Sequence, residues 1–400
     1  MHREIYNSME ISHFIREKQI SNFETLKQIL ESAPFNLKIK EDIDYPNLFL
    51  VCNQNEIINS SLLEEPSQFN IMKIIRECNG IIMEKSTFKI VCYTFNRCLE
   101  DSSLDTILDI DNLYVEPALE GTLVRLYYYD DRWNISTKKC IDASKSKWLS
   151  EKNFYQLFLE CLNNYNIEED LIKTNCYSFI LAHPENNIVV KYNSPLLFHI
   201  STRDLLTLQE IDIKINIQSP QRTKIEKDYL SNLLGQLLND TNLSYEGYIL
   251  IDTKYNRQKL KTLLYKKVRT IWGNTNNRFM RFLELRKDIG MLNEYLSYYP
   301  DDKDNFIMYE NKISELANDI LQYYLLKHVN KENIKVPFYF SKIIYKLHGD
   351  FFKNKVKTSH SKVMLELIEL DPKKICFMCN HHDKLKVSGI QYYTNATMQE

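Results

Sequence analysis

The chain has 400 residues, of which 44% are hydrophobic and 26% charged, and its formal net charge at pH 7 is −2. This length exceeds an ordinary single domain, and this hydrophobic content can fill complete cores, so a disordered chain is excluded and two domains are expected. The nearly balanced charge excludes a uniformly basic nucleic-acid coat, but it does not exclude a local basic groove.

Cysteine usage and hydropathy bear on the compartment. Nine cysteines are scattered without regular spacing, and no N-terminal apolar segment resembles a signal peptide. We therefore expect reduced thiols and an intracellular, by default cytoplasmic, location. No apolar run approaches the roughly 18 residues that span a bilayer, which predicts no membrane association. The abundance of Ile, Asn, Lys and Tyr is typical of an AT-rich genome, such as that of a large DNA virus, for which the compartment would be the host cytoplasm.

The first 70 residues predict one helix and two strands. The helix covers Asn22–Ser32, and Ser21 and Glu24 have the spacing of a capping box at its start. Two strands and a polar loop follow, at Phe35–Ile39, Leu48–Cys52 and 53–70.

From Ile71 onward the pattern favours strands. The clearest signal is a hairpin whose first strand, Thr122–Tyr129, alternates and is rich in β-branched and aromatic residues. Alternation places one or two of the three tyrosines at 127–129 in the core. The other elements expected here are strands at Gly80–Met83, Phe88–Tyr93, Tyr245–Ile251 and Gln258–Leu264, a hairpin over Tyr177–Tyr192 that turns at Pro184–Asn187, and helices at Phe154–Leu162 and Ile225–Leu238.

After Trp272 the periodicity becomes helical. One apolar face is formed by Ile313, Leu316, Ile320 and Tyr324, and further helices fit Phe338–Leu347 and Ser361–Leu370. The sequence therefore predicts an α+β protein. We expect an N-terminal flank over 1–70, a β-rich core over 71–270 and an all-helical C-terminal domain over 271–400.

Short segments of the β-rich region resemble, in order, motifs of the phage-type tRNA-repair RNA ligases, which are covalent nucleotidyltransferases. Two of them are intact: Tyr245–Leu250 resembles the family's metal-associated Glu-Gly strand, and Gln258–Thr262 its closing Lys-x-Lys strand. Weaker matches are Arg76–Met83, Ala118–Thr122 with Ser136–Lys139 after it, and Phe179–Val190. The resemblance covers about residues 70–270 and implies a nucleotidyltransferase-like domain. In the family, helical C-terminal domains help to recognise RNA.

Three positions depart from the family pattern. Ala118 stands where the family has the lysine that attacks the α-phosphate of ATP, while Glu120 and Gly121 of the same motif are kept. Asn79 replaces an arginine and Ile180 replaces an acid. Alanine has no nucleophilic atom, and three joint changes favour a degenerate site over a single odd replacement.

The resemblance implies a set of ligand contacts. Glu246 would position a divalent cation, with ATP and Mg²⁺ as the implied cofactors. Lys259 and Lys261, at i and i+2 of one strand, point the same way and can reach one phosphate cluster. The implied nucleotide or phosphate contacts are Arg97, Glu120, Lys138, Lys259 and Lys261. The structural alternatives are a solvated edge strand for the two strand lysines, a salt bridge from Glu246 to one of them, and plain surface charges for Lys138 and Lys139.

These observations lead to three hypotheses of function. The first is an RNA-ligase-like protein that binds nucleotide or RNA ends but is impaired in self-adenylation or lacks it, because of Ala118. The second is an active ATP-dependent RNA ligase, which uses a lysine elsewhere or seals ends that arrive adenylated. The third is a non-catalytic scaffold with a protein partner.

Two further sites are weaker. Cys376 and Cys379 form half of a zinc pattern, but they also fit one apolar helix face with Ile375. His183 lies in the predicted hairpin turn, where we expect it to be exposed.

Overall fold

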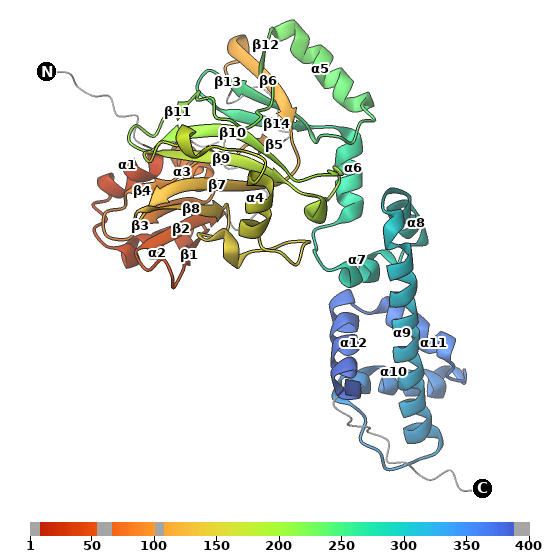
Figure 1. The fold of residues 1–400 in the computed structure, drawn as a ribbon. Coiled ribbons are helices and arrows are strands. Elements are labelled where there is room, and N and C mark those ends of the chain that lie inside the picture. Colours follow the sequence, from red (N-terminus) through yellow and green to blue (C-terminus); the bar gives the residue numbers. More distant parts are fainter. Residues whose placement is uncertain (1–8, 54–65, 101–107, 388–400) are drawn as a thin grey trace, which may run out of the picture. The chain divides into compact units, whose positions relative to one another are not determined.

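The computed structural model describes residues 9–53, 66–100 and 108–387. The chain divides into two compact units, Met1–Lys267 and Val268–Glu400. The first unit contains three sheets and the helices around them, and the elements described in the second are helical (Figure 1). The predicted α+β class, with a helical C-terminal region, is confirmed.

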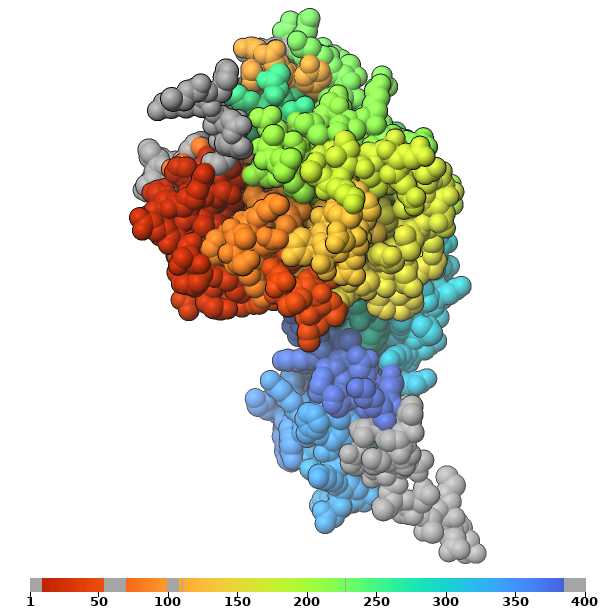
Figure 2. Space-filling view, turned by 60° about the vertical axis from the view of Figure 1, so that its left-hand side comes forward, coloured from red at the N-terminus to blue at the C-terminus, as the bar shows by residue number. Residues whose placement is uncertain are grey.

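The first sheet has the strand order β1-β2-β3-β4, and its neighbours are antiparallel. Three helices pack against it, burying Leu26, Leu30, Phe49 and Met83 in one core. The strands are β1 (Leu37–Glu41), β2 (Leu48–Asn53), β3 (Ile81–Glu84) and β4 (Ile90–Cys92), and the helices are α1 (Glu10–Glu17), α2 (Phe23–Glu31) and α3 (Pro66–Glu77). In Figure 2 the N-terminal residues, in red, form one continuous surface next to the orange segments that follow them in the chain.

Two local predictions for this region are wrong. Helix α2 is capped by Asn22, whose side chain accepts a hydrogen bond from the Thr25 amide, and not by Ser21. The segment from Ile71 to Glu77 continues helix α3 and is not a strand. Its apolar residues at 72, 74, 75 and 78 are all buried in the core under the first sheet, so tertiary packing decided the conformation.

The second sheet has the order β11-β10-β9-β7-β8 and is antiparallel throughout. Helix α4 covers it, with Phe158 packed on Phe179. Tyr127 is fully buried while the next two tyrosines are half-buried, so one tyrosine of the three belongs to the core. The elements are β7 (Thr122–Tyr129), β8 (Arg132–Thr137), α4 (Phe154–Leu162), β9 (Asn175–Ala182), β10 (Leu196–Asp204) and β11 (Glu210–Ile211).

The third sheet has the order β12-β6-β13-β14-β5. Helix α5 packs on it through Leu230, Leu233 and Leu237. The elements are β5 (Leu99–Glu100), β6 (Leu113–Ala118), β12 (Thr223–Ile225), α5 (Lys227–Asn239), β13 (Gly247–Asp252) and β14 (Arg257–Lys261). Short 3-10 turns complete the first unit at Ile110–Asn112, Ala143–Lys145, Glu168–Asp170 and Pro184–Asn186.

The predicted hairpin over Tyr177–Tyr192 is also wrong. Strand β9 pairs with β10, which begins at Leu196, and residues 187–195 form no strand. The reason is local: the amides of Val189 and Val190, which a strand would use for pairing, both donate to the Glu120 carboxylate.

The second unit has the predicted helical core. Ile313, Leu316, Ile320 and Tyr324 are all buried on α9, and Trp272 stacks on Tyr295. Helix α6 (Leu263–Trp272) crosses the division between the units. The remaining elements are α7 (Arg278–Leu285), α8 (Ile289–Tyr298), a 3-10 turn (Pro300–Asp302), α9 (Lys303–Tyr324), a π-helical turn (Leu325–Val329), α10 (Phe338–Asn354), α11 (His360–Glu369) and α12 (Pro372–Val387). Across the described ranges, no helix has both the length and the apolar character to cross a bilayer.

Candidate functional site

One face of the third sheet carries the residues singled out by the sequence. In the register of β6, β13 and β14, Ala118 lies opposite Gly247, which lies opposite Lys261. Directly opposed residues share a face, and Lys259, two residues earlier on β14, shares it as well. With two strand spacings between them, the Cα atoms of Ala118 and Lys261 are roughly 10 Å apart. The methyl group of Ala118 is fully buried on this face.

Glu246 immediately precedes β13 and forms an ion pair with Lys259. The Lys259 Nζ atom is 3.0 Å from Glu246 Oε2, and the Glu246 side chain is largely buried. The backbone fixes this position from both sides, because the Glu246 amide donates to the Ala118 carbonyl and its own carbonyl accepts from the Thr262 amide. The salt bridge considered as an alternative for Glu246 is therefore present. The other carboxylate oxygen accepts no hydrogen bond within the described part of the chain, which leaves it available to a cation.

Lys138 directly follows β8. It is half-buried, whereas Lys139 is exposed, so the two are not equivalent surface charges. Burial lowers the pKa of Lys138 to about 8, Cys98 opposes this, and Lys259, Arg97 and Arg125 add smaller lowering effects. These influences bring a residue from the second sheet, one from the third and one from the segment after β4 into electrostatic range of each other.

A buried guanidinium that sequence reasoning did not select lies next to this group. Arg76, at the end of α3, is 8% exposed, and its Nε and one Nη atom have no hydrogen-bond partner among the described residues. Its carbonyl accepts the amide of Arg97, which ties the two residues together. The side-chain nitrogen of Asn79 is likewise buried without a partner. Burial lowers the pKa of Arg76 and outweighs the opposing effects of its neighbours, which include Asp252 and Glu77. The sequence signal that could have selected Arg76 was its place at the start of the motif Arg76–Met83.

Glu120 differs from the other predicted contacts. One carboxylate oxygen accepts the amides of Val189 and Val190 at 2.9 and 2.6 Å, and the other accepts the Tyr265 hydroxyl at 2.7 Å. Burial raises the pKa of Glu120, against these three donors. Gly121 follows with a φ of +157°, and a Cβ there would lie 2.5 Å from a methyl group of Ile180. The motif thus folds tightly onto β9, and its acid is occupied by internal donors.

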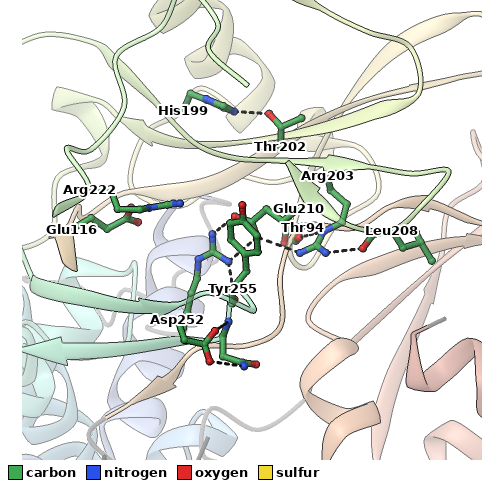
Figure 3. Close-up of polar contacts among 12 residues, drawn as sticks. Thr94, Glu116, His199, Thr202, Arg203, Leu208, Glu210, Arg222, Asp252 and Tyr255 are labelled. Carbon is green, nitrogen blue, oxygen red and sulfur yellow. Dashed lines mark hydrogen bonds and ion pairs between the residues drawn. The ribbon is translucent and has the colours of Figure 1, made fainter. Parts of the chain in front are cut away.

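A second set of cations near this face is fully paired, and Figure 3 shows it. The Glu210 carboxylate lies between Arg257, with one N–O distance of 2.8 Å, and Arg203 at 3.3 Å. Arg203 also donates to the carbonyls of Thr94 and Leu208. Arg257 shares its side of β14 with Lys259, two residues on. The second and third sheets are therefore linked by Glu210 at one end of β14, with the lysines beyond it.

His183 is buried, with 4% exposed, so the prediction of an exposed histidine is wrong. Its Nδ1 accepts the Glu185 amide at 3.2 Å, so Nε2 carries the proton and donates to Glu160 at 3.1 Å. Glu160, His183 and Glu185 are close enough to hold a metal ion. However, the Lys152 ammonium already bridges the two carboxylates at 3.0 and 2.6 Å, and the protonated Nε2 offers no lone pair.

The zinc pattern in the tail lies along a helix. Cys376 and Cys379 are both on α12, and Cys379 is buried with Ile375. In the described ranges, the cluster around His183 is the one group of three or more potential ligands found within reach of a common ion, and it contains neither cysteine. All nine cysteines are free thiols.

The chain is similar at low identity to several viral proteins, one of which is a phage RNA ligase. No family model matches the chain. The chain is 25% identical over 339 residues, 73% of its length, to 70% of the immediate-early protein ICP-46 homolog of Invertebrate iridescent virus 6. It is 24% identical over 248 residues, 50% of its length, to the RNA ligase of Rhodothermus phage RM378, and it spans about half (55%) of that ligase. Among solved structures, an archaeal ATP-dependent RNA ligase matches 92% of this chain and 79% of its own at 11% identity and a TM-score of 0.35, which does not by itself establish a shared fold.

Proposed function

The chain is a divergent relative of the RNA-ligase family of nucleotidyltransferases, and from this premise we propose that it binds the phosphates of a nucleotide or an RNA end together with a divalent cation. One observation carries the proposal. Lys138 follows β8, and Arg97 and Lys259, which come from two other segments, each lie close enough to it to lower its pKa. A polyphosphate has several negative charges and could contact more than one of these cations at once, including Lys259, which also pairs with Glu246.

Each cation has a role in this proposal. Lys259 and Lys261 hold phosphate oxygens from the strand β14, and Lys138 and Arg97 hold them from the opposite side. Arg76, buried and short of partners, supplies a guanidinium behind Arg97. Glu120 acts in the scaffold, since internal donors already engage both of its oxygens.

A divalent cation fits the donor set. Glu246 would hold it through the carboxylate oxygen that the Lys259 ion pair leaves open. Mg²⁺ is commonly bound through one or two carboxylates, with water and substrate phosphates completing its shell. When bound, it neutralises phosphate charge, and ATP with Mg²⁺ is the ligand pair we propose.

Residue 118 takes no part in covalent chemistry in this proposal. We propose that Ala118 stands at the family's nucleophile position, where an alanine cannot form a lysyl-nucleotide, so that the chain does not adenylate itself by the family's own route. Sealing of RNA ends that are already adenylated is the second candidate activity. It is favoured by the intact Glu246–Lys259 pair, because joining such ends needs orientation and charge stabilisation but no amine at residue 118.

The test is binding of a non-hydrolysable ATP analogue with Mg²⁺, measured by isothermal titration calorimetry. Lys259→Met removes a charge-assisted contact and is expected to weaken binding by about tenfold, or roughly 1.4 kcal/mol. The matched control is Lys254→Met, an exposed lysine in the turn between β13 and β14, which should leave affinity unchanged. Absence of binding by the parent chain, or equal losses in the two variants, would contradict the proposal.

A further inference from the structure

Helix α10 of the second unit has apolar residues on two sides (Figure 1). Its inner side is buried against the neighbouring helices, where the Phe340 ring lies 5.8 Å from the ring of Tyr323 on α9. Its outer side carries three large aromatic residues, Phe338, Tyr345 and Phe352, which are 71%, 55% and 59% exposed. Soluble proteins rarely expose several large apolar side chains in one place without a binding partner for them.

The three exposed residues form a line along the helix, which we call the aromatic stripe. They are seven positions apart, and seven residues return a helix to within about 20° of the same direction. Neighbouring members of the stripe are therefore about 10.5 Å apart along the helix axis. Large apolar residues at this spacing are the pattern by which one helix packs along another. The aromatic stripe thus has the geometry of a helix-packing seam.

Gly349 leaves a hole in the aromatic stripe between Tyr345 and Phe352. A Cβ at this position would meet no described atom within 4 Å, apart from the adjoining helix backbone. A glycine inside a helix destabilises the helix relative to alanine, and the surrounding structure does not require one here. When helices pack, a side chain of one inserts between residues of the other. Gly349 therefore leaves space for a side chain of a partner.

The segment that contains the aromatic stripe is strongly basic. From Lys327 to Lys357 it has eight lysines and two acids, a formal charge of +6, whereas the whole chain has −2. One of the two acids, Asp350, is already paired with Lys362 at 3.7 Å. Lys342 and Lys353 border the stripe and are exposed, and in the part of the chain that the structure describes neither forms an ion pair. The charge of this surface is complementary to an acidic partner.

Two other occupants fit the aromatic stripe less well. A second copy of the chain would use the same patch on both molecules and would bring their lysines together. A single-stranded nucleic acid stacks its bases on open ring faces. However, the Lys327 ammonium lies over the Tyr345 ring, 5.3 Å from its centroid, and that of Lys355 lies 5.6 Å from the centroid of Phe352. A base would have to displace these lysines, whereas a packed helix contacts the ring edges between them.

We propose that the outer side of α10 is a docking surface for an acidic amphipathic helix of a partner protein. The apolar residues of that helix repeat every seven positions and pack between the rings of the aromatic stripe, with one of them over Gly349. Its glutamate or aspartate residues pair with the lysines that border the stripe. This inference is independent of the proposed function, because the docking surface shares no residue with the phosphate-binding group.

The experiment measures fluorescence anisotropy of a fluorescein-labelled synthetic peptide as the full chain is added. The peptide has four heptads, with leucine at positions a and d and glutamate at e and g. We expect saturable binding that weakens as the salt concentration is raised. A peptide of the same composition in scrambled order tests the seam, and one with lysine at e and g tests the charge. Each should bind at least about tenfold more weakly than the first peptide.

Two variants test the surface itself. Tyr345→Glu places a negative charge in the aromatic stripe and should weaken binding of the acidic peptide by about tenfold or more. Gly349→Gln fills the hole and should weaken binding by a similar factor. Its thermal unfolding midpoint should equal or exceed that of the parent chain, because glutamine is a better helix former than glycine. Tyr155→Glu, at an exposed tyrosine of α4, is the matched control and should bind the peptide as the parent does.

Several results would overturn the inference. They are failure of the parent chain to bind the acidic peptide, equal binding of the ordered and scrambled peptides, and undiminished binding by Gly349→Gln. A labelled oligouridylate that binds in place of the peptide and is lost in Tyr345→Glu would assign the surface to RNA. A parent chain that sediments as a dimer, with Tyr345→Glu as a monomer, would assign it to a second copy of the chain.

Discussion

Two groups of cations in the first unit differ in what balances their charge. Arg257 and Arg203 share the buried carboxylate of Glu210, and each also contacts backbone carbonyls or an aromatic ring. Arg76 and Lys138 are also buried or half-buried, but among the described residues neither has an ion pair with a carboxylate.

The pKa values of Arg257 and Lys138 are shifted in opposite directions. Burial acts to lower the pKa of Arg257, but the Glu210 carboxylate reverses this, and the net pKa is raised. Burial also lowers the pKa of Lys138, and there the neighbouring cations add to the effect. A buried charge with a fitted partner is part of the fold, whereas one without a partner is a candidate for ligand binding or chemistry. We therefore regard the Glu210 group as structural and the Lys138 group as functional.

The largest effect is expected from Glu210→Ala. This change leaves Arg257 and Arg203 buried without their anion, and breaking such a pair typically costs about 3–5 kcal/mol. The free energy of unfolding, measured by urea denaturation of the full chain, should fall by that amount. Glu169→Ala, at an exposed acid of a 3-10 turn, is the matched control and should have no effect. A loss below about 1 kcal/mol, the level of a surface pair, would show that the paired group is not structural.

An intermediate effect is expected from Glu120→Ala. The change orphans the amides of Val189 and Val190 and the Tyr265 hydroxyl, and each buried unsatisfied donor costs about 1–3 kcal/mol. Since water can enter the space left by the side chain, we expect a net loss of about 2–3 kcal/mol in unfolding free energy. Tyr265→Phe removes one donor and should cost about 1 kcal/mol.

A second change at residue 120 distinguishes a structural role of Glu120 from a role in ligand binding. Glu120→Gln keeps one carbonyl acceptor and should bind the ATP analogue as well as the parent chain does, at reduced stability. If it retained stability but lost affinity for the analogue, Glu120 would belong with Lys138 among the ligand contacts.

Features set by local interactions could be predicted from the sequence, and features set by contacts between distant residues could not. Strand β7 and helix α4 were predicted because alternation and helical periodicity are local properties. The shared direction of Lys259 and Lys261 was local for the same reason. The partner of β9 was not predictable, because Glu120, 69 residues before Val189, competes for the amides that a strand would use. The burial of His183 likewise depends on Glu160, which lies on another element.

The candidate site divides in the same way. Its residue types were readable from short motifs, but the influence of Lys259 on Lys138 depends on how segments far apart in the chain pack together. No pattern within either segment encodes that proximity. Arg76 was missed because a buried arginine and an exposed one look alike in a helical sequence.

The smallest effect is a pH dependence of stability that belongs to the Lys138 group alone. The pKa of Lys138 is lowered from 10.5 to about 8 in the folded chain, so between these pH values the unfolded chain holds more protons. Stability should therefore rise with pH over that interval, because the cost of the folded cation is present below about pH 8 and is lost above it.

Lys138→Met removes this cost. Its unfolding free energy at pH 7 should exceed that of the parent by on the order of 1 kcal/mol, a value reduced from the full shift because the side chain is half-buried, and the difference should vanish toward pH 10.5. Because Cys98 acts against the lowering of the Lys138 pKa, the comparison is repeated with Cys98→Ser in both chains. A Lys138→Met chain that is less stable than the parent at every pH would place Lys138 with Arg257 as a structural cation, and the contrast between the two groups would be lost.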